Sequence, residues 1–429
     1  MYDLKASELG DFDVAVFGGG VAGVFAAVSA ARAGAKVIII ERSGAFGGTL
    51  TEGFVPRMMD SSNKGGLVRE LFAFLDGHGM SGARSGKRSP ETGKLLPGDL
   101  VDTEGCKYFF DKIVREAGVK VLFYSQVAAL DTENGHIKSA LIVSELANYT
   151  LSAKIYVDAT GNGSAAAMAG CGWDFGDPKT KIPHPVSMGS CIIGLGDDFH
   201  GTNSSEEKSA YAEMLSKHGI KVSAEQATVV TLPSCKEWTF SVNFGYGVGP
   251  DDTERLSECT ADGRREIFET VEAHKRIVGF QDVSLAFTSS HIGIREGRRI
   301  YGEYRISDGD IISGRRFDDG ICLVTMTVDV HKMSKNDSPT DYDRGLKTKP
   351  YHIPYRALVP LGVDNLILAG RCISGDFYPH SSYRVMGNMS AVGEAAGFAA
   401  AMCAKEEKHP RELDGKAVAE FMRSRHYEI

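Results

Sequence analysis

A glycine-rich turn near the N-terminus constrains this chain more than any other feature. It follows the apolar segment 13–17 and reads Gly18-Gly19-Gly20-Val21-Ala22-Gly23, which has the spacing G-x-G-x-x-G. In this pattern the first glycine permits a tight turn after a strand, the second lets a pyrophosphate approach the backbone, and the third lets a helix pack closely. Free N–H groups and the positive end of the helix dipole favour an anion there. We therefore expect this turn to bind a dinucleotide.

The residues that follow the turn narrow the choice of dinucleotide. A helix of small residues is expected over 22–33, Gly34 is typical of a helix end, and an apolar strand over 36–40 runs into Glu41. An acidic side chain at this position accepts hydrogen bonds from the ribose hydroxyls of adenosine and repels a 2′-phosphate. The pattern therefore predicts FAD or NAD rather than NADP.

Composition limits the class of protein. The chain has 429 residues, of which 42% are apolar and 24% charged, as in ordinary globular proteins of two or three domains. It has no apolar run of the roughly 20 residues needed to span a bilayer, and residues 1–5 lack the order of a secretory signal. A net charge of −8 disfavours a nucleic-acid partner. We expect a cytoplasmic protein with no membrane insertion and no nucleic acid.

The eight cysteines are scattered and form no C-x-x-C motif. Zinc sites, iron–sulfur clusters and redox dithiols commonly use such pairs. We therefore expect reduced, mostly buried thiols and no metal site.

A second glycine-rich segment begins at Arg42 and contains Gly47-Gly48-Thr49. A domain that binds only NAD does not require it, and close backbone approach to a longer ligand would explain it. Further along, residues 77–100 carry no apolar period and predict a mobile loop. Two interpretations of this loop stay open, a lid over an active site and a disordered surface insertion.

The middle of the chain predicts a change of architecture. A helix over 106–117 and a strand over 119–124 are followed by an antiparallel ribbon over 127–157, which turns at Asn134-Gly135. Later strands are expected at 227–232, 237–244 and 322–330, around a charged helix at 262–276. We assign these later elements to a substrate domain.

The end of the chain returns to the first domain. A buried strand over 363–371 ends in Gly370-Arg371, and a helix of small residues is expected over 387–402. The dinucleotide-binding domain is therefore discontinuous. We place its first part at 1–165, the substrate domain at 166–350 and the return at 351–429.

Further blocks extend the pattern over nearly the whole chain: Asp158-Ala159-Thr160-Gly161, segments 293–302 and 351–356, Arg384-Val385-Met386 and Gly393-Glu394-Ala395-Ala396-Gly397. With the two glycine-rich segments and Glu41, they resemble FAD-dependent oxidoreductases built on the glutathione-reductase type of FAD-binding fold. The resemblance implies an α/β protein with a Rossmann-like FAD-binding domain and an inserted, β-rich α+β substrate domain.

The resemblance also implies cofactor contacts. Ala159, Thr160 and Gly161 would lie near the adenosine and the pyrophosphate, and Val127 would contact the adenine through its backbone. Gly370 and Arg371 would end the returning strand at the cofactor. The N–H groups of Val385, Gly387 and Asn388, at the start of the last long helix, would face the flavin pyrimidine and favour its anionic reduced form.

Two absences refine this expectation. Residues 165–350 contain no second G-x-G-x-x-G, so an internal NAD(P)H domain is not expected. No histidine lies between Ser43 and Gly53, where some related flavoproteins attach FAD covalently. We expect non-covalent FAD.

The substrate-site candidates precede the last helix. Arg384 could clamp a carboxylate or polarise a carbonyl, and His380 or Tyr383, in a loop over 374–384, could exchange a proton. A second group of donors comprises His291, Arg295, Arg298 and Arg299, of which Arg295 is expected to face the substrate and Arg298 or Arg299 the water. His352 and Arg356 are interpreted as an interdomain brace.

The expected reaction is a hydride transfer between flavin N5 and a small, anionic or polyhydroxy organic substrate, with an external electron donor or acceptor. The direction of transfer stays open, and the sequence does not predict an oligomeric state. Two alternatives remain, a flavoprotein subunit that passes electrons to a partner protein and an NAD-binding module without flavin.

Overall fold

The computed structural model describes residues 5–83, 98–196, 199–224, 226–235, 237–337 and 345–429. Its main sheet has the strand order β5-β2-β1-β8-β7-β6, with β17 also pairing with β8. The strands are β1 (Ser7–Phe17), β2 (Val37–Ile40), β5 (Lys120–Leu122), β6 (Ser125–Glu133), β7 (His136–Ser144), β8 (Asn148–Asp158) and β17 (Leu366–Leu368). All pairs among β5, β2, β1, β8 and β17 are parallel, which gives a mixed α/β fold with a Rossmann-like core.

The expected ribbon over 127–157 is only partly an antiparallel ribbon. Strands β6 and β7 pair antiparallel, and Asn134 and Gly135 between them have φ values of 50° and 78°, as a tight primed turn requires. Strand β8 pairs with β7 at its start but runs parallel to β1 along its length. It joins the parallel core because residues 155–158 are apolar or buried on both faces.

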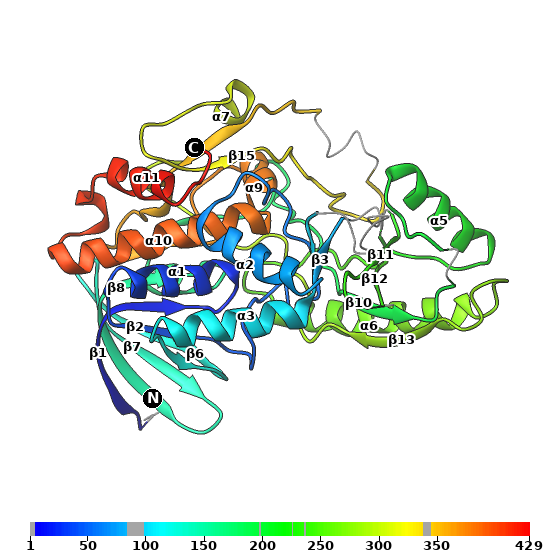
Figure 1. Cartoon of the computed structure of the whole chain (residues 1–429), viewed down its shortest axis with the longest axis horizontal. Helices are drawn as coiled ribbons and strands as arrows, with labels where there is room; N and C mark the ends of the chain where they lie inside the picture. The colour runs from blue at the N-terminus through cyan, green and yellow to red at the C-terminus, as the bar shows by residue number, and fades with distance from the viewer. Residues whose placement is uncertain (1–4, 84–97, 197–198, 225, 236, 338–344) are drawn as a thin grey trace.

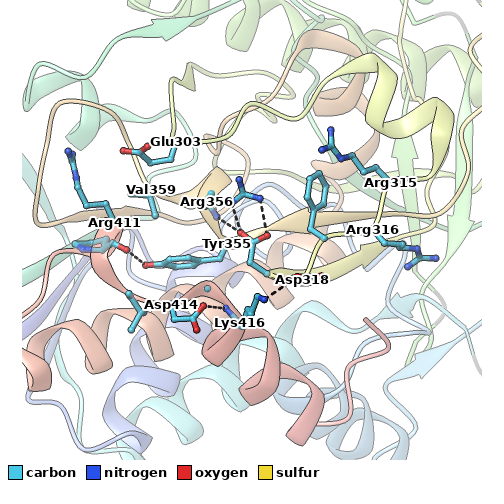
Figure 2. Close-up of a pocket in the computed structure, with 15 residues that line it drawn as sticks. Glu303, Arg315, Arg316, Asp318, Tyr355, Arg356, Val359, Arg411, Asp414 and Lys416 are labelled. Carbon is cyan, nitrogen blue, oxygen red and sulfur yellow. Dashed lines mark hydrogen bonds and ion pairs between the residues drawn. The ribbon is translucent and has the colours of Figure 1, made fainter.

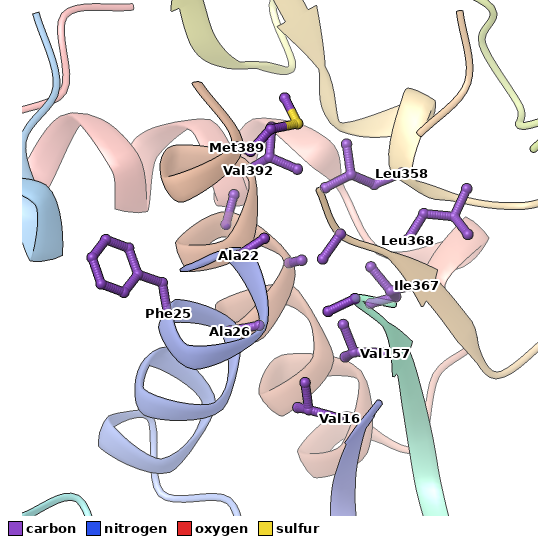
Figure 3. Close-up of a cluster of buried hydrophobic side chains, with 14 of the residues drawn as sticks. Val16, Ala22, Phe25, Ala26, Val157, Leu358, Ile367, Leu368, Met389 and Val392 are labelled. Carbon is purple, nitrogen blue, oxygen red and sulfur yellow. The ribbon is translucent and has the colours of Figure 1, made fainter. Parts of the chain in front are cut away.

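Helices α1 (Val21–Arg32) and α10 (Met386–Glu406) lie side by side against the sheet (Figures 1 and 3). Glycines make this contact possible. A Cβ atom on Gly393 would lie 2.2 Å from the carbonyl oxygen of Ala22, and one on Gly397 would lie 2.0 Å from that of Ala26. The predicted long helix of small residues is therefore confirmed, and its composition is explained by backbone-to-backbone packing.

Further helices and several short strands surround this core. They are α2 (Gly66–Gly77), β3 (Ser81–Gly82), β4 (Leu100–Val101), α3 (Thr103–Glu116), α4 (Ser164–Met168), β9 (Trp173–Asp174), β14 (Arg299–Ile300), α7 (Asp308–Ser313), β15 (Gly320–Val324), β16 (Tyr351–Pro354), η1 (Tyr355–Leu358), α9 (Phe377–Tyr383), η2 (Pro410–Glu412) and α11 (Gly415–Ser424). Most of the expected loop over 77–100 falls at 84–97, outside the described residues. Its described ends pair as β3 and β4.

A second lobe lies at the end of the molecule remote from β6 and β7 (Figure 1). It contains an antiparallel sheet of order β11-β12-β10-β13 and two helices. Their bounds are β10 (Ser190–Ile193), α5 (Ser205–Lys217), β11 (Thr228–Thr231), β12 (Trp238–Ser241), α6 (Thr253–His274) and β13 (Ser284–Thr288). The lobe has its own buried apolar cluster, drawn from residues 188–283.

The expected strand at 322–330 does not join this second sheet. It forms as β15, which pairs antiparallel with β16, and Ile321, Cys322 and Val324 pack in the core of the first lobe. The strand pattern alone does not identify a strand's partner, which explains the error. The division of the chain at residues 165 and 350 stays a prediction.

Seven of the eight cysteines are buried and Cys235 is exposed, and all eight are unpaired, which confirms the expected thiols. Among the described residues, no helix combines the length and the apolar character that crossing a bilayer requires.

The α1–α10 contact makes a prediction about stability. Gly393→Ala should lower the free energy of unfolding by about 2–3 kcal/mol, because the new methyl group overlaps a backbone oxygen that is held in a helix. The matched control is Gly77→Ala in the exposed last turn of α2, where a Cβ meets no atom within 4 Å. Thermal or urea unfolding should show the control unchanged or slightly more stable. Equal effects of the two substitutions would contradict the proposed packing.

Candidate functional site

Three glycines at the end of β1 form the first wall of the site. Gly18 has a φ of 102°, and a Cβ there would lie 2.5 Å from the carbonyl oxygen of Ala159. At Gly23 a Cβ would lie 1.8 Å from the carbonyl oxygen of Gly18, whereas at Gly20 it would meet no atom within 4 Å. The turn is therefore tight at Gly18 and Gly23 and open at Gly20, as close approach of a ligand requires.

The start of α1 lies at this opening. Gly20 is the residue before the helix, no side chain caps its N-terminus, and its first turn contains no acidic residue. Val21 and Ala22 therefore present backbone N–H groups that have no partner within the helix. Such a helix end binds phosphate well.

Glu41 lies beside the turn at the end of β2. Its carboxylate accepts hydrogen bonds from the N–H of Gly19, at 2.5 Å, and from the N–H of Ser43, at 2.8 Å. Arg42, the next residue, is exposed. The start of β6 also lies next to Glu41, because the N–H of Ser125 donates to the backbone carbonyl of Glu41. Val127, two residues further along β6, is buried.

The second glycine-rich segment contacts the first. The N–H of Gly47 donates to the carbonyl of Gly19 at 2.9 Å, and a Cβ on Gly48 would lie 3.1 Å from the Cα atom of Gly20. Both glycines have positive φ, and Thr49 continues the same turn. The two segments therefore line one cradle.

The end of β8 supplies a third side of this cradle. The buried carboxylate of Asp158 accepts hydrogen bonds from the N–H and hydroxyl of Thr160, at 3.0 and 2.7 Å, which holds the turn over 159–161 against Gly18. Gly161 has a φ of 75°, and a Cβ there would lie 2.8 Å from the guanidinium of Arg371. Ala159, Thr160 and Gly161 thus lie beside the first glycine-rich turn, and their contact with the cofactor stays a prediction.

Arg371 is a half-buried cation beside the glycines. It donates to the side-chain oxygen of Asn162 at 2.7 Å, and its Nε atom is buried without a hydrogen-bond partner among the described residues. Burial lowers its pKa to about 10, so it stays charged at neutral pH. A Cβ atom added to the preceding Gly370 would lie 3.4 Å from the Cβ atom of Ala22. A ligand with phosphate groups would supply the missing negative charge.

The N-terminus of α10 differs from the expectation in one respect. Val385 precedes the helix and no side chain caps it, but the N–H of Gly387 donates to the carbonyl of Met59 at 3.1 Å. The expectation that the N–H of Gly387 is free is therefore wrong, because the backbone of residues 59–60 packs against this glycine. Asn388 is fully buried, with its side-chain oxygen 3.6 Å from Sγ of Cys322.

Together these observations test the fit of a dinucleotide. The cradle has room at Gly20 for a pyrophosphate. The uncapped helix end and the buried, unpartnered Nε of Arg371 are donors of the kind that a pyrophosphate needs. The residues present fit FAD.

The expected loop over 374–384 is a buried helix, α9, followed by Arg384. His380 and Tyr383 both have zero exposure, and Tyr383 donates its hydroxyl to the carbonyl of Ile373 at 3.1 Å. Burial, and then the charges of Arg384 and Arg299, hold the pKa of His380 well below its usual range. In this conformation His380 is neutral and has no access to solvent.

Arg384 and Arg295, the two arginines predicted to bind substrate, lie in contact. Arg384 donates to the carbonyl of Arg295 at 3.1 Å and to the carbonyl of Asp329 at 2.8 Å, and its side chain is 7% exposed. Arg295 donates to the carbonyl of Pro185 at 2.8 Å and lies 4.9 Å above the ring of Phe244. Burial lowers the pKa of Arg295 to about 10, and the charge of Arg384 adds to this effect.

Sequence reasoning missed three side chains at this junction. Asp329 lies 3.7 Å from the guanidinium of Arg384 and 3.3 Å from Nε2 of His331. His184 is buried, stacks on Phe377 and has Nε2 2.9 Å from the hydroxyl of Ser381. The spacing D-x-H at 329–331 could have indicated the first two, because residues two apart in an extended segment share a face.

The second group of donors divides between two places. Arg299 is fully buried and pairs with Glu296, and Arg298 is 12% exposed and pairs with Asp251. The expectation that Arg298 or Arg299 faces water is therefore wrong, because the guanidinium groups of both are held by carboxylates and backbone carbonyls of the protein. The ring of His291 is half-buried next to Ser290.

A cavity of about 820 Å³ lies elsewhere, between η1, η2 and α11 (Figure 2). Charges of both signs line it and pair with each other: Arg356 lies 2.9 Å from Asp319, and Lys416 lies 3.1 Å from Asp318. None of the cradle residues is among its lining residues. We therefore place the functional site at the cradle and at the Arg384 junction.

Comparison with known proteins finds similar chains. A curated relative, the mitochondrial dihydrolipoyl dehydrogenase of Schizosaccharomyces pombe, is 44% identical over 57 residues, which are 13% of this chain and 11% of the relative. The structure of p-nitrophenol 4-monooxygenase PnpA from Pseudomonas putida DLL-E4 superposes with a TM-score of 0.50 at 14% identity, over 97% of this chain and 87% of that one. A geranylgeranyl bacteriochlorophyll reductase-like protein from Thermoplasma acidophilum gives 0.46 at 14% identity, over 96% and 82%.

The similarity to the monooxygenase shows a shared fold. The family evidence is more extensive, because the profile described as FAD dependent oxidoreductase matches residues 13–422. The chain therefore belongs to the family of FAD-dependent oxidoreductases and is an enzyme of that family with FAD as its cofactor.

Proposed function

We propose that this enzyme transfers a hydride between flavin N5 and a small organic substrate, anionic or polyhydroxy, that Arg384 and Arg295 bind. The proposal depends on one observation. Arg384, which lies just before α10 in the chain, contacts Arg295, and the carboxylate of Asp329 is near both. When bound, the flavin supplies the hydride chemistry. The residues of the chain bind the substrate, orient it and move protons.

The proposed cofactor arrangement is of the glutathione-reductase type. Glu41, Val127 and residues 159–161 would hold the adenosine, the amides at 20–23 and Arg371 the pyrophosphate, and Gly47, Gly48 and Thr49 the adjoining chain. The uncapped start of α10 would face the flavin pyrimidine. The lobe built on residues 188–283 would act as the inserted substrate domain.

FAD is proposed to bind without a covalent bond. No histidine lies between Ser43 and Gly53, and His184 and His380 are buried in contacts with α9 or within it. The electrons would pass to or from an external donor or acceptor, because the sequence has no C-x-x-C pair of the kind that serves as an internal redox dithiol.

The charge at the junction favours an anion. Arg384 and Arg295 contribute two positive charges and Asp329 one negative charge, while the nearby His184 is held neutral by burial and by Arg384. The backbone carbonyls of residues 295 and 329 orient the Arg384 guanidinium, so little side-chain freedom is lost when an anion binds. His380 and Tyr383, which are fully buried, stay predicted proton-exchanging residues that act only if α9 moves.

Cofactor binding can be separated from folding at Gly20. Gly20→Val should leave the fold intact, because the position has an ordinary negative φ and no atom near its Cβ, but should weaken FAD binding at least about 10-fold by occupying the open cradle. Flavin absorbance, and FAD released by heat, measure the loss. The control is Gly34→Ala, at a positive φ outside the cradle, which should cost stability and retain the yellow cofactor. Full FAD content in Gly20→Val would contradict the assignment.

The anion role of Arg384 is tested by anaerobic flavin reduction with a panel of hydroxy acids, sugars and amines. For the substrate found, Arg384→Ala should lower kcat/KM about 100-fold or more, because a charge-assisted, oriented hydrogen bond is lost, and Arg384→Lys should recover only part of it. The control, Arg411→Ala, removes an arginine paired with Asp364 and should have no effect. An unchanged rate in Arg384→Ala would contradict the proposed site.

A further inference from the structure

His331 has no part in the proposed function so far, although it lies on the same segment as Asp329. This segment follows β15 and is tied to α9 by two hydrogen bonds. Asp329 N–H donates to the carbonyl of Ser381 at 3.1 Å, and the hydroxyl of Ser382 donates to the carbonyl of Met326 at 2.7 Å. Because α9 leads directly to Arg384, these bonds hold Asp329 and His331 at the arginine junction.

His331 contacts the surroundings of both arginines. Its Nε2 atom lies 3.3 Å from the Asp329 carboxylate oxygen that is itself 3.7 Å from Arg384. Its ring packs edge-on against Phe244, with ring centres 5.5 Å apart, and the guanidinium of Arg295 lies on that same ring. The His331 side chain is 26% exposed, so it is open to a ligand, unlike the fully buried His380.

The pair has a defined protonation pattern. Burial raises the pKa of Asp329, but the hydrogen bond from His331 and the charges of His331, Arg384 and Arg295 outweigh burial and hold this pKa well below its usual range. An ionised carboxylate only accepts hydrogen bonds, so it favours the His331 tautomer with the proton on Nε2. Nδ1 is then left with a lone pair that can accept a proton.

The other groups that face His331 do not change charge near neutral pH. Asp329 stays ionised, and Arg384 and Arg295 stay charged. His184, whose ring centre lies 6.4 Å from that of His331, is kept neutral by burial and by Arg384. Burial and Arg295 lower the pKa of His331 while Asp329 opposes them, so the free ring is neutral at neutral pH.

We propose that His331, oriented by Asp329, exchanges a proton with the ligand at the anion site formed by Arg384 and Arg295, without the movement of α9 that His380 and Tyr383 would need. The inference rests on the proposed function, which places a substrate anion there. For a substrate that carries a hydroxyl group, oxidation breaks the C–H and O–H bonds and forms C=O. The hydrogen leaves carbon with two electrons to the cofactor, and the hydroxyl proton passes to Nδ1 of His331. Reduction uses the same groups in reverse.

Proton uptake on anion binding tests this role without a known substrate. Oxalate is titrated into the FAD-loaded enzyme at about pH 6.5, in buffers that differ in ionisation enthalpy, and the heats give the number of protons bound. An anion beside His331 raises its pKa, so the wild-type enzyme should take up several tenths of a proton, and His331→Gln should take up close to none. Oxalate affinity should stay within about 10-fold in this variant, since the arginines remain.

Asp329→Asn is an independent second variant. It removes a negative charge from the site, while the backbone carbonyl of residue 329 still holds Arg384. Oxalate should bind about 3- to 10-fold more tightly, because the positive charge is less compensated, and proton uptake should fall, because His331 loses the group that raises its pKa. A merely structural role of Asp329 would instead weaken binding. FAD content and thermal midpoint monitor folding in both variants.

The outcomes distinguish the two proposals. Oxalate binding without proton uptake in the wild type, or uptake that persists in His331→Gln, overturns the role of His331 and leaves the arginine site standing. Weaker binding by Asp329→Asn overturns the role of Asp329. Failure of the wild-type enzyme to bind oxalate overturns the anion site of the proposed function, and the inference that rests on it fails as well.

Discussion

Close backbone contact at glycines is the constraint on which the rest of this structure depends. Gly23 lets α1 approach the carbonyl of Gly18, and Gly393 and Gly397 let α10 approach the carbonyls of Ala22 and Ala26. Because no side chain separates these elements, the ends of β1, α1 and α10 are held in one small volume (Figure 3). The cradle and the arginine junction are both built at its edges.

Positive charge that is largely removed from water is the second recurring feature. Arg371, Arg384 and Arg295 are held mainly by neutral acceptors, an amide oxygen for Arg371 and backbone carbonyls for the other two. A cation removed from water and held mostly by neutral groups is costly unless an anion balances it, and Asp329, 3.7 Å from Arg384, balances only one of the two junction arginines. A pyrophosphate beside Arg371 and a substrate anion beside Arg384 would both lower this cost. The same electrostatic argument therefore connects cofactor binding with the proposed substrate site.

Local patterns predicted the parts of the site that depend on few neighbouring residues. The turn at 18–23, Glu41 at the end of β2 and the long helix of small residues were all recognisable, because each requires particular residue types at fixed spacing. Helix α9 was missed because its residues, including Pro379, have weak helix propensity, and burial in the core stabilises it instead. The partner of β15 was missed because a strand pattern does not specify which edge it pairs with.

The sequence by itself determined that a strand, a tight glycine turn and a helix bind a dinucleotide, because backbone geometry at glycine is a local property. It also determined that α10 is a helix able to pack closely. Only the tertiary structure decided that the side chain of His380, on α9, is fully buried while His331 and Asp329 lie next to Arg384. The exposure and pKa of these groups depend on neighbours that are distant in sequence, and those neighbours are brought together only by folding.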